Sequence, residues 1–254
     1  MDAADTIRNA VARVTALRQH VASAPELHAA ALAVKAFQAQ RFAGTYADLL
    51  ASVEYAGAAR FFLNDLYSDK DYSLRDAQFA RIAGALQRIF PKQVVATAVT
   101  MAQLHILTEE LDRQMAVVWA DSASSAPEAD TVERYRACWL TVGRQDDRNR
   151  QLEMVLRVGV DMDKLTRAPG LRMMLRMMRR PAHAAGLGSL QMFLESGFDT
   201  FAQMSGKGAR AREFLKMIEE RESVWIKRLS DRDDRLAEAQ LRACVGQAPR
   251  VSQA

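Results

Sequence analysis

The feature that most constrains the fold is a helical spacing of apolar residues that recurs along nearly the whole chain. In residues 4–23, for example, Ile7, Val11, Val14 and Val21 are separated by steps of three, four and seven, which places them on one side of an α-helix. Runs of Val, Ile or Thr are nearly absent, whereas Ala, Leu, Met, Arg, Gln and Glu, which lose least on entering a helix, dominate the composition. The sequence therefore predicts an all-α protein.

Prolines and polar segments divide this pattern into about ten helices. Pro25 and Pro91 each suit the first turn of a helix, where an amide without a partner is lost at no cost. The predicted helices cover residues 4–23, 25–50, 55–67, 73–90, 91–119, 128–142, 146–167, 170–180, 184–204 and 210–230. Each apolar stripe needs partners from other helices. We therefore expect one bundle-like domain over 1–230, with a mobile linker near 121–130 and a disordered polar tail over 231–254.

The charge and apolar content are those of an ordinary soluble protein, with 26% charged and 49% hydrophobic residues and a net charge of +4. This modest basic excess is not typical of a nucleic-acid-binding protein. The stretch VVATAVTMAQLHIL (94–107) is too short to cross a bilayer, so no membrane partner is expected. Cys138 and Cys244 form neither a disulfide framework nor a metal-type spacing, and we expect a cytoplasmic location.

In the segment FFLNDLYSDKDYSLRDAQFARI (61–82), an aromatic run is followed by a cluster of acidic and basic residues. Ser73 precedes an apolar period and Asp76 follows three residues later, a spacing that predicts a capping box. Asp71 lies just outside, where its charge favours the positive end of the helix. Capping does not explain Arg75 or Arg81, which either bridge to other helices or face a ligand.

The same segment resembles the signature FFLxxLY…DxxxRDAxxARI of an uncharacterised, all-helical family found in proteobacteria. The resemblance continues through LHILTEELD (104–112), RPAHAAGLGSLQMFLESGF (180–198) and RES (221–223), so it covers most of residues 40–230. Ser68 stands where the family has a glycine after the residue that matches Tyr67. The resemblance implies a helical fold and carries no function, because the family is uncharacterised.

Ionisable residues interrupt the apolar stripes of two predicted helices. His105 and Asp112 lie on an otherwise largely apolar face of helix 91–119, with Glu109 one turn from His105. Glu222 interrupts the stripe of helix 210–230 in the same way. A buried charge without partners costs several kcal/mol. These groups must therefore be paired with other side chains, solvated in a pocket, or bound to a ligand.

Inward-facing acids on two helices could place His105, Glu109, Asp112 and Glu222 around one cavity, as in helical bundles that hold metal centres. Three interpretations are open: a structural hydrogen-bond network, a ligand pocket, and a metal centre. The spacing His-x-x-x-Glu-x-x-Asp lacks the Glu-x-x-His pairs of di-iron bundles, which argues against the metal centre.

The segment RAPGLRMMLRMMRRPAH (167–183) holds five arginines, one histidine and no acid. Arg172, Arg176 and Arg179 follow one another at helical spacing, opposite an apolar side formed by Leu171, Met174, Leu175 and Met178. Such a helix can be a core helix with a solvated face, can hold an acidic ligand or partner, or can lie on an anionic membrane. The absence of Trp and Phe within the segment argues against the membrane.

Motifs that would assign a reaction are missing: the sequence has no P-loop, no Gly-x-Ser-x-Gly elbow and no His-Glu-x-x-His. No cofactor is indicated, and whether the protein is an enzyme stays open, as does a homo-oligomeric state. The sequence favours a binding protein for a small acidic ligand or a protein partner, and the family resemblance implies a bacterial origin. The candidate binding residues are Arg75, His105, Glu109, Asp112, Arg172, Arg176, Arg179 and Glu222. The alternative is a metal-dependent oxidative or hydrolytic enzyme that uses His105, Glu109, Asp112 and Glu222.

Overall fold

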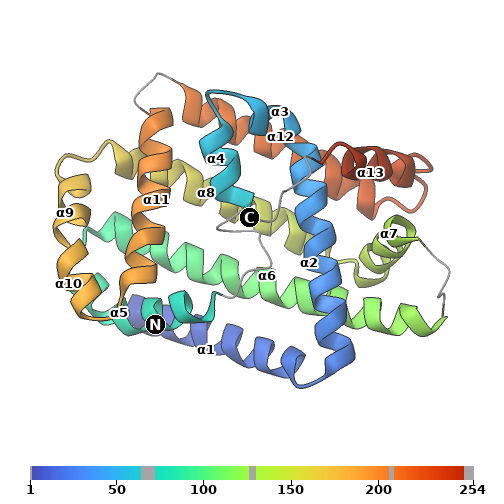
Figure 1. Cartoon of the computed structure of the whole chain (residues 1–254), viewed down its shortest axis with the longest axis horizontal. Coiled ribbons are helices and arrows are strands. Elements are labelled where there is room, and N and C mark those ends of the chain that lie inside the picture. The colour runs from blue at the N-terminus through green and yellow to red at the C-terminus, as the bar shows by residue number, and fades with distance from the viewer. Residues whose placement is uncertain (1, 64–71, 126–129, 206–208, 249–254) are drawn as a thin grey trace. The chain divides into compact units, whose positions relative to one another are not determined.

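The computed structural model describes residues 2–63, 72–125, 130–205 and 209–248, and within these ranges it contains helices and no strand (Figure 1). The described ranges hold thirteen helices, of which ten have seven residues or more. They are α1 (Ala3–Ala22), α2 (Pro25–Thr45), α3 (Ala47–Ala51), α4 (Ala56–Phe61), α5 (Ser73–Ile89), α6 (Lys92–Ser125), α7 (Thr131–Val142), α8 (Gln145–Thr166), α9 (Leu171–Met177), α10 (Arg179–Ala184), α11 (Gly188–Ser205), α12 (Arg210–Ser230) and α13 (Ala237–Gly246). The all-α prediction is confirmed.

Local chemistry explains where several helices begin and end. Pro25 occupies the first turn of α2, as predicted. The Asp130 carboxylate caps α7 by accepting from the amides of Val132 and Glu133 at 2.8 and 2.9 Å. Gly143 ends α7 with a φ of 62°, a left-handed backbone angle that glycine adopts without the steric cost of a Cβ atom.

The predicted linker near 121–130 is helical in its first half, because α6 continues to Ser125. Residues 126–129 lie outside the described residues. The hydroxyl of Ser122 donates to the carbonyl of Trp119 at 2.8 Å and accepts from Arg134 Nε at 2.9 Å. The Arg134 guanidinium also lies 4.5 Å from the centre of the Trp119 ring. Contacts from α7 thus hold a segment whose small polar composition suggested a linker.

A further correction concerns the tail predicted to be disordered from residue 231. Residues 237–246 form α13, which packs against α2 and α7. Ala237 and Leu241 are fully buried, and Cys244 is 8% exposed. The prediction missed this helix because α13 is short, has a single apolar side and follows a polar stretch. Residues 249–254 lie outside the described residues.

The chain divides into two compact units. Unit 1 comprises Met1–Leu17, Lys70–Glu109 and Gln151–Glu219, and unit 2 comprises Arg18–Asp69, Glu110–Arg150 and Glu220–Ala254. The expectation of one domain over residues 1–230 stays a prediction.

Unit 1 contains two apolar clusters. The first joins α1, α5 and α6 through small side chains, with Ile7 and Ala83 both fully buried. The second joins α8, α9 and α11 through Leu165, Leu171 and Phe198. A polar contact also joins α5 to α11: the side-chain oxygen of Gln78, on α5, accepts a hydrogen bond from the backbone amide of Leu190, on α11, at 2.8 Å. The second cluster includes Leu171 of α9. This helix belongs to the arginine- and methionine-rich segment 167–183, called the basic methionine segment below.

Unit 2 has an aromatic core between α2 and α7. The rings of Phe37 and Tyr135 stack with their centres 4.3 Å apart, and Tyr135 lies 6.2 Å from Trp139. At Gly44 of α2, a Cβ atom would come within 1.8 Å of the carbonyl oxygen of Cys244 on α13. Only glycine permits this approach, so Gly44 determines how closely α13 packs on α2.

None of the helices in the described ranges has the length and apolar character needed to cross a membrane.

Candidate functional site

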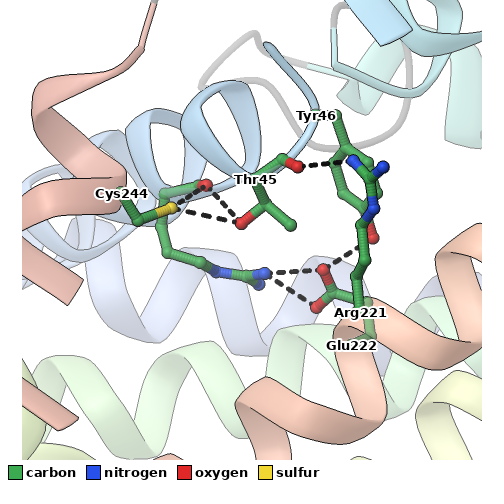
Figure 2. A network of polar contacts seen from close by, with 6 residues as sticks. Thr45, Tyr46, Arg221, Glu222 and Cys244 are labelled. Atoms are coloured by element: carbon green, nitrogen blue, oxygen red, sulfur yellow. Dashed lines mark hydrogen bonds and ion pairs between the residues drawn. The ribbon is translucent and has the colours of Figure 1, made fainter. Parts of the chain in front are cut away.

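A buried set of polar side chains in unit 2 surrounds the carboxylate of Glu222 on α12 (Figure 2). Arg41 Nη1, from α2, donates to the two carboxylate oxygens at 2.6 and 2.8 Å, and the Tyr46 hydroxyl donates to one of them at 2.8 Å. Burial disfavours the charge of Arg41, but the Glu222 carboxylate outweighs it and raises the pKa of Arg41 above its ordinary value. The predicted inward orientation of Glu222 is confirmed by its burial.

Neighbouring side chains tie α2, α12 and α13 together around this pair (Figure 2). The Cys244 thiol donates to the carbonyl of Arg41 at 3.3 Å and lies 3.3 Å from Thr45 Oγ1. Arg221 Nη1 donates to the carbonyl of Thr45 at 2.8 Å. Burial raises the pKa of the Cys244 thiol, so it is protonated near neutral pH and suits packing better than nucleophilic chemistry.

Asp112, on α6, is also buried in unit 2, with an exposed fraction of 8%, as its place on an apolar stripe predicted. Its Oδ1 accepts from Gln38 Nε2 of α2 at 3.2 Å. Close by, burial raises the pKa of the Tyr135 hydroxyl, against the opposing influence of Arg148 and Arg41. Asp112 is thus part of a charged neighbourhood that includes two buried arginines.

Arg148 is the second of these arginines and lies in the first turn of α8 with only 5% of its surface exposed. Its guanidinium lies 4.3 Å from the centre of the Trp139 ring. Nε and Nη2 are buried and have no hydrogen-bond partner among the residues that the structure describes. Burial lowers the pKa of Arg148, and the nearby Tyr135 and Asp112 oppose that shift. Arg148 differs from Arg41 in having no carboxylate bound to it.

In unit 1, His105 of α6 is paired with Asp76 of α5. His105 Nε2 lies 2.9 Å from Asp76 Oδ2, and Asp76 is 7% exposed. The predicted capping box is therefore wrong: the Asp76 side chain turns into the protein toward His105. Tyr72, one residue earlier than expected, takes the N-cap position, and its carbonyl accepts the Asp76 amide at 2.9 Å. A buried partner for the carboxylate outweighs a local contact with the helix end.

Arg75 packs against aromatic side chains of unit 1, and its predicted role in ligand binding stays a prediction. Its guanidinium lies between two rings, 4.0 Å from the centre of Tyr72 and 4.3 Å from the centre of Phe193. Its Nε is 3.9 Å from Asp76 Oδ1. Arg81, the other arginine of this segment, donates to the carbonyl of Ala185. Both arginines bridge between helices of unit 1.

The four residues proposed to share one cavity, His105, Glu109, Asp112 and Glu222, are divided between the two units. His105 and Glu109 belong to unit 1, where Glu109 is 8% exposed, whereas Asp112 and Glu222 belong to unit 2. Among the residues that the structure describes, no group of three or more His, Cys, Asp or Glu side chains could hold a metal ion. The metal-dependent enzyme is therefore not the favoured alternative.

The basic methionine segment forms two short helices, α9 and α10, instead of the single helix predicted over 170–180. The amide of Met178 donates to the carbonyl of Met174 at 3.1 Å, and the amide of Ala182 donates to the carbonyl of Met178 at 2.8 Å. Helical spacing therefore continues through Met178. Leu171 is buried and Leu175 is half-buried, in agreement with the predicted apolar side. Both helices pack against α11 (Figure 1).

Two of the predicted arginines are paired with acids of α11. Arg172 Nη2 lies 2.7 Å from Asp199 Oδ1, and Arg179 Nε donates to both Glu195 oxygens at 2.7 Å. The hydrogen bond from Arg179 is the main reason that the pKa of Glu195 lies below its ordinary value, and the charge of Arg176 contributes to the same shift. Arg176 itself makes no hydrogen bond or ion pair with the described residues.

Sequence reasoning missed Arg41, Tyr46, Asp76 and Arg148 as members of these networks. For Arg41 a signal existed, because it follows Val34 and Phe37 on one helical stripe and both are buried. For Asp76 the capping pattern hid the buried role. Nothing in the apolar pattern marks Arg148, whose neighbours Trp139 and Tyr135 lie on the preceding helix, α7.

No curated protein and no solved structure matches the chain. A protein-family model, described as a domain of unknown function (DUF8198), matches residues 17–235. This range includes α2 to α12, and with them the Glu222 network, the His105–Asp76 pair and the basic methionine segment. The chain belongs to this family, whose function is not assigned.

Proposed function

We propose that this protein is a helical binding protein whose partner is an acidic amphipathic helix of another protein. The docking surface is the methionine–arginine face, which we define as Met173, Arg176, Met177 and Arg180 on α9 and α10. The observation that carries the proposal is the exposure of two methionines beside two arginines that have no acidic partner in the described part of the chain.

The apolar half of the face consists of Met173 and Met177, which are 61% and 66% exposed. They are four residues apart in one helix, so they lie on the same side. Single exposed apolar residues are ordinary on a protein surface. Methionine is flexible and polarisable, however, and a pair at this spacing suits an adaptable helix-binding surface.

The charged half consists of Arg176 and Arg180, which are both exposed and again four residues apart. The flanking Arg172 and Arg179 are neutralised by Asp199 and Glu195 of α11. No hydrogen bond or ion pair joins Arg176 or Arg180 to a described residue. Their charges are thus available to a partner, and carboxylates on that partner would complement them.

A partner helix is better supported than a small acidic ligand at this place. The hollow beside the face has a volume of only about 10 Å³, roughly the space of one water molecule, and is lined by Arg172, Leu175, Arg176, Glu195, Phe198 and Asp199. Sites for drug-sized ligands usually measure about 300–1,000 Å³. The two carboxylates of the lining already bind Arg172 and Arg179, so neither arginine is available to a small anion.

A synthetic acidic helix tests the proposal directly. The probe is a fluorescent peptide of about 20 residues, long enough to form a helix, with Leu at i, i+4 and i+7 and Glu around them. We expect anisotropy to show binding that weakens as salt is added. The double variant Arg176→Glu/Arg180→Glu should weaken binding at least tenfold, because two attractive charges become repulsive.

The matched control is Arg150→Glu/Arg157→Glu, which makes the same change of net charge at two exposed arginines of α8. This control should bind as the unchanged protein does. A scrambled peptide of equal composition, without an apolar side, should bind at least tenfold more weakly. Equal binding of both peptides, or an equal loss in both double variants, would overturn the proposal. Binding to anionic vesicles without binding to the peptide would also overturn it and would favour a membrane surface.

Three broader expectations belong to the same proposal. A cytoplasmic location is supported by two unpaired thiols, Cys138 and Cys244, both buried. Proteobacterial origin and the FFLxxLY…DxxxRDAxxARI signature rest on the sequence resemblance. A homo-oligomer stays a prediction that sedimentation at several concentrations would test.

A further inference from the structure

A buried guanidinium in unit 2 carries an inference that is independent of the methionine–arginine face. Arg148 is 5% exposed, yet it has no ion pair with any described acid and two of its three nitrogens lack an acceptor. Its counterpart Arg41, 6% exposed, forms an ion pair with Glu222, and one of its nitrogens, Nε, lacks an acceptor among the described residues. A buried cation whose donors have no acceptors is unfavourable, and in the described part of the chain Arg148 has two such atoms, whereas Arg41 and Arg136 have one each.

The two nitrogens without acceptors are Nε and Nη2. On a guanidinium, the N–H bonds of these two atoms are parallel and form one edge of the planar group. A carboxylate can accept both bonds at once, which is the strongest arrangement that arginine makes with an oxyanion. The unmatched donors therefore have the geometry of a carboxylate receptor.

The surroundings favour an organic acid over an inorganic anion. The central carbon of the guanidinium lies over the Trp139 ring, and Tyr135 lies next to Trp139 in the same aromatic core. Aromatic side chains provide an apolar wall for the body of a ligand while the charged edge of Arg148 fixes its carboxylate. The nearby acids are already engaged: Asp112 accepts from Gln38, and Glu222 accepts from Arg41 and Tyr46.

We propose that unit 2 binds a small monocarboxylic acid, with its carboxylate on the Nε–Nη2 edge of Arg148 and its apolar body against Trp139 and Tyr135. Because Arg148 is nearly enclosed, the ligand reaches it only when neighbouring side chains move.

Thermal unfolding of the full chain tests this site, with sodium benzoate as the probe and chloride used to keep the ionic strength constant. A ligand that binds only the folded state raises the melting temperature as its concentration exceeds the Kd. We expect a rise of about 2–4 °C when benzoate exceeds its Kd about fivefold. Benzyl alcohol, which has the same ring without the carboxylate, should produce no such rise.

Two variants identify the residue responsible. Arg148→Met should abolish the benzoate response, because it keeps much of the volume and removes the donors. Arg148→Lys should weaken the response at least tenfold in concentration, because a lysine retains the charge without the parallel N–H bonds. Arg150→Met, which changes an exposed arginine two residues further along α8, should respond as the unchanged protein does.

A response that persists in Arg148→Met would overturn the proposal, as would no response to benzoate or a response to phosphate alone. If Arg148→Met fails to fold, the Arg148 Nε–H resonance of the unchanged protein gives a second readout by NMR. It should shift on addition of benzoate and not on addition of benzyl alcohol, and an unchanged resonance would overturn the assignment. Because the acidic-peptide experiment concerns residues of unit 1, its failure would leave this result unaffected.

Discussion

Arg41 and Glu222 are 181 positions apart in the sequence and form a buried ion pair, with Arg41 Nη1 at 2.6 Å from one carboxylate oxygen and 2.8 Å from the other. The pair joins α2 to α12, and Tyr46 adds a hydrogen bond to the same carboxylate. Both charges are removed from water, so each depends on the other for compensation. The loss of either group should therefore destabilise unit 2.

Replacing Glu222 by alanine should destabilise the protein by about 3–5 kcal/mol, because it leaves the Arg41 guanidinium buried without its carboxylate. Urea unfolding at pH 7 followed by circular dichroism measures the change. The exposed Glu219, three residues earlier on the same helix, provides the control: Glu219→Ala should change the stability by no more than about 0.5 kcal/mol.

The double variant Arg41→Met/Glu222→Leu should be more stable than Glu222→Ala alone, since it removes both charges and keeps much of the buried volume. If the double variant were the less stable of the two, the argument from an uncompensated charge would be wrong.

The inward orientation of Glu222 and Asp112 could be predicted from the sequence, because each interrupts an apolar stripe of a long helix. Their partners could not be predicted. Arg41 and Gln38 both come from α2, and which arginine or amide reaches a buried acid depends on how the helices pack. The helical class follows from local periodicity, whereas the pairing of charges follows from tertiary contacts.

Replacing Gly44 by alanine should destabilise the protein by about 1–3 kcal/mol or more. The added Cβ would come within 1.8 Å of the Cys244 carbonyl oxygen, and because the obstacle is backbone, α13 must move away from α2. Gly246→Ala is the matched control in α13 itself, where nothing lies within 4 Å of the added atom. Thermal unfolding should show a loss for Gly44→Ala and little change for Gly246→Ala. Equal effects would contradict the close packing of α13 on α2.

The two local predictions that the structure corrects, the capping box at Ser73 and the disorder of residues 237–246, failed for a common physical reason. At Ser73 and Asp76 a local capping pattern was present, but a buried contact with His105 took the carboxylate. In residues 237–246 the helix is short, and its stability comes from packing on α2 and α7. Short-range rules describe what a segment can do alone, and both segments are determined by partners distant in the sequence.

Replacing Asp112 by alanine should destabilise the protein by about 3 kcal/mol, since the residue is 8% exposed and its charge lies near the buried Arg148. Asp112→Asn should cost less, because the amide oxygen can still accept from Gln38. Chemical unfolding of both variants measures the difference. Glu153→Ala, at an exposed position of α8, should have almost no effect. An unchanged stability in Asp112→Ala would show that this carboxylate is not needed in the buried cluster.

Replacing Asp48 by asparagine should give a stability difference that depends on pH. Arg221 donates to both Asp48 oxygens at 2.7 Å, and this hydrogen bonding lowers the pKa of Asp48 below its ordinary value of 3.8. A carboxyl whose pKa is depressed in the folded state stabilises the protein above its unfolded pKa, and that contribution is lost as the pH falls through the folded value.

The free energy of unfolding of the unchanged protein should therefore exceed that of Asp48→Asn by up to about 0.5 kcal/mol at pH 7. The value is small because the Asp48 side chain is 60% exposed. Urea unfolding between pH 7 and pH 2 should show a difference that is constant above pH about 5, declines below the ordinary pKa, and vanishes only once the pH is below the lowered pKa of the folded state. The exposed Glu153→Gln serves as the control, and a difference that grew toward acid pH would have the wrong sign for a carboxylate held by Arg221.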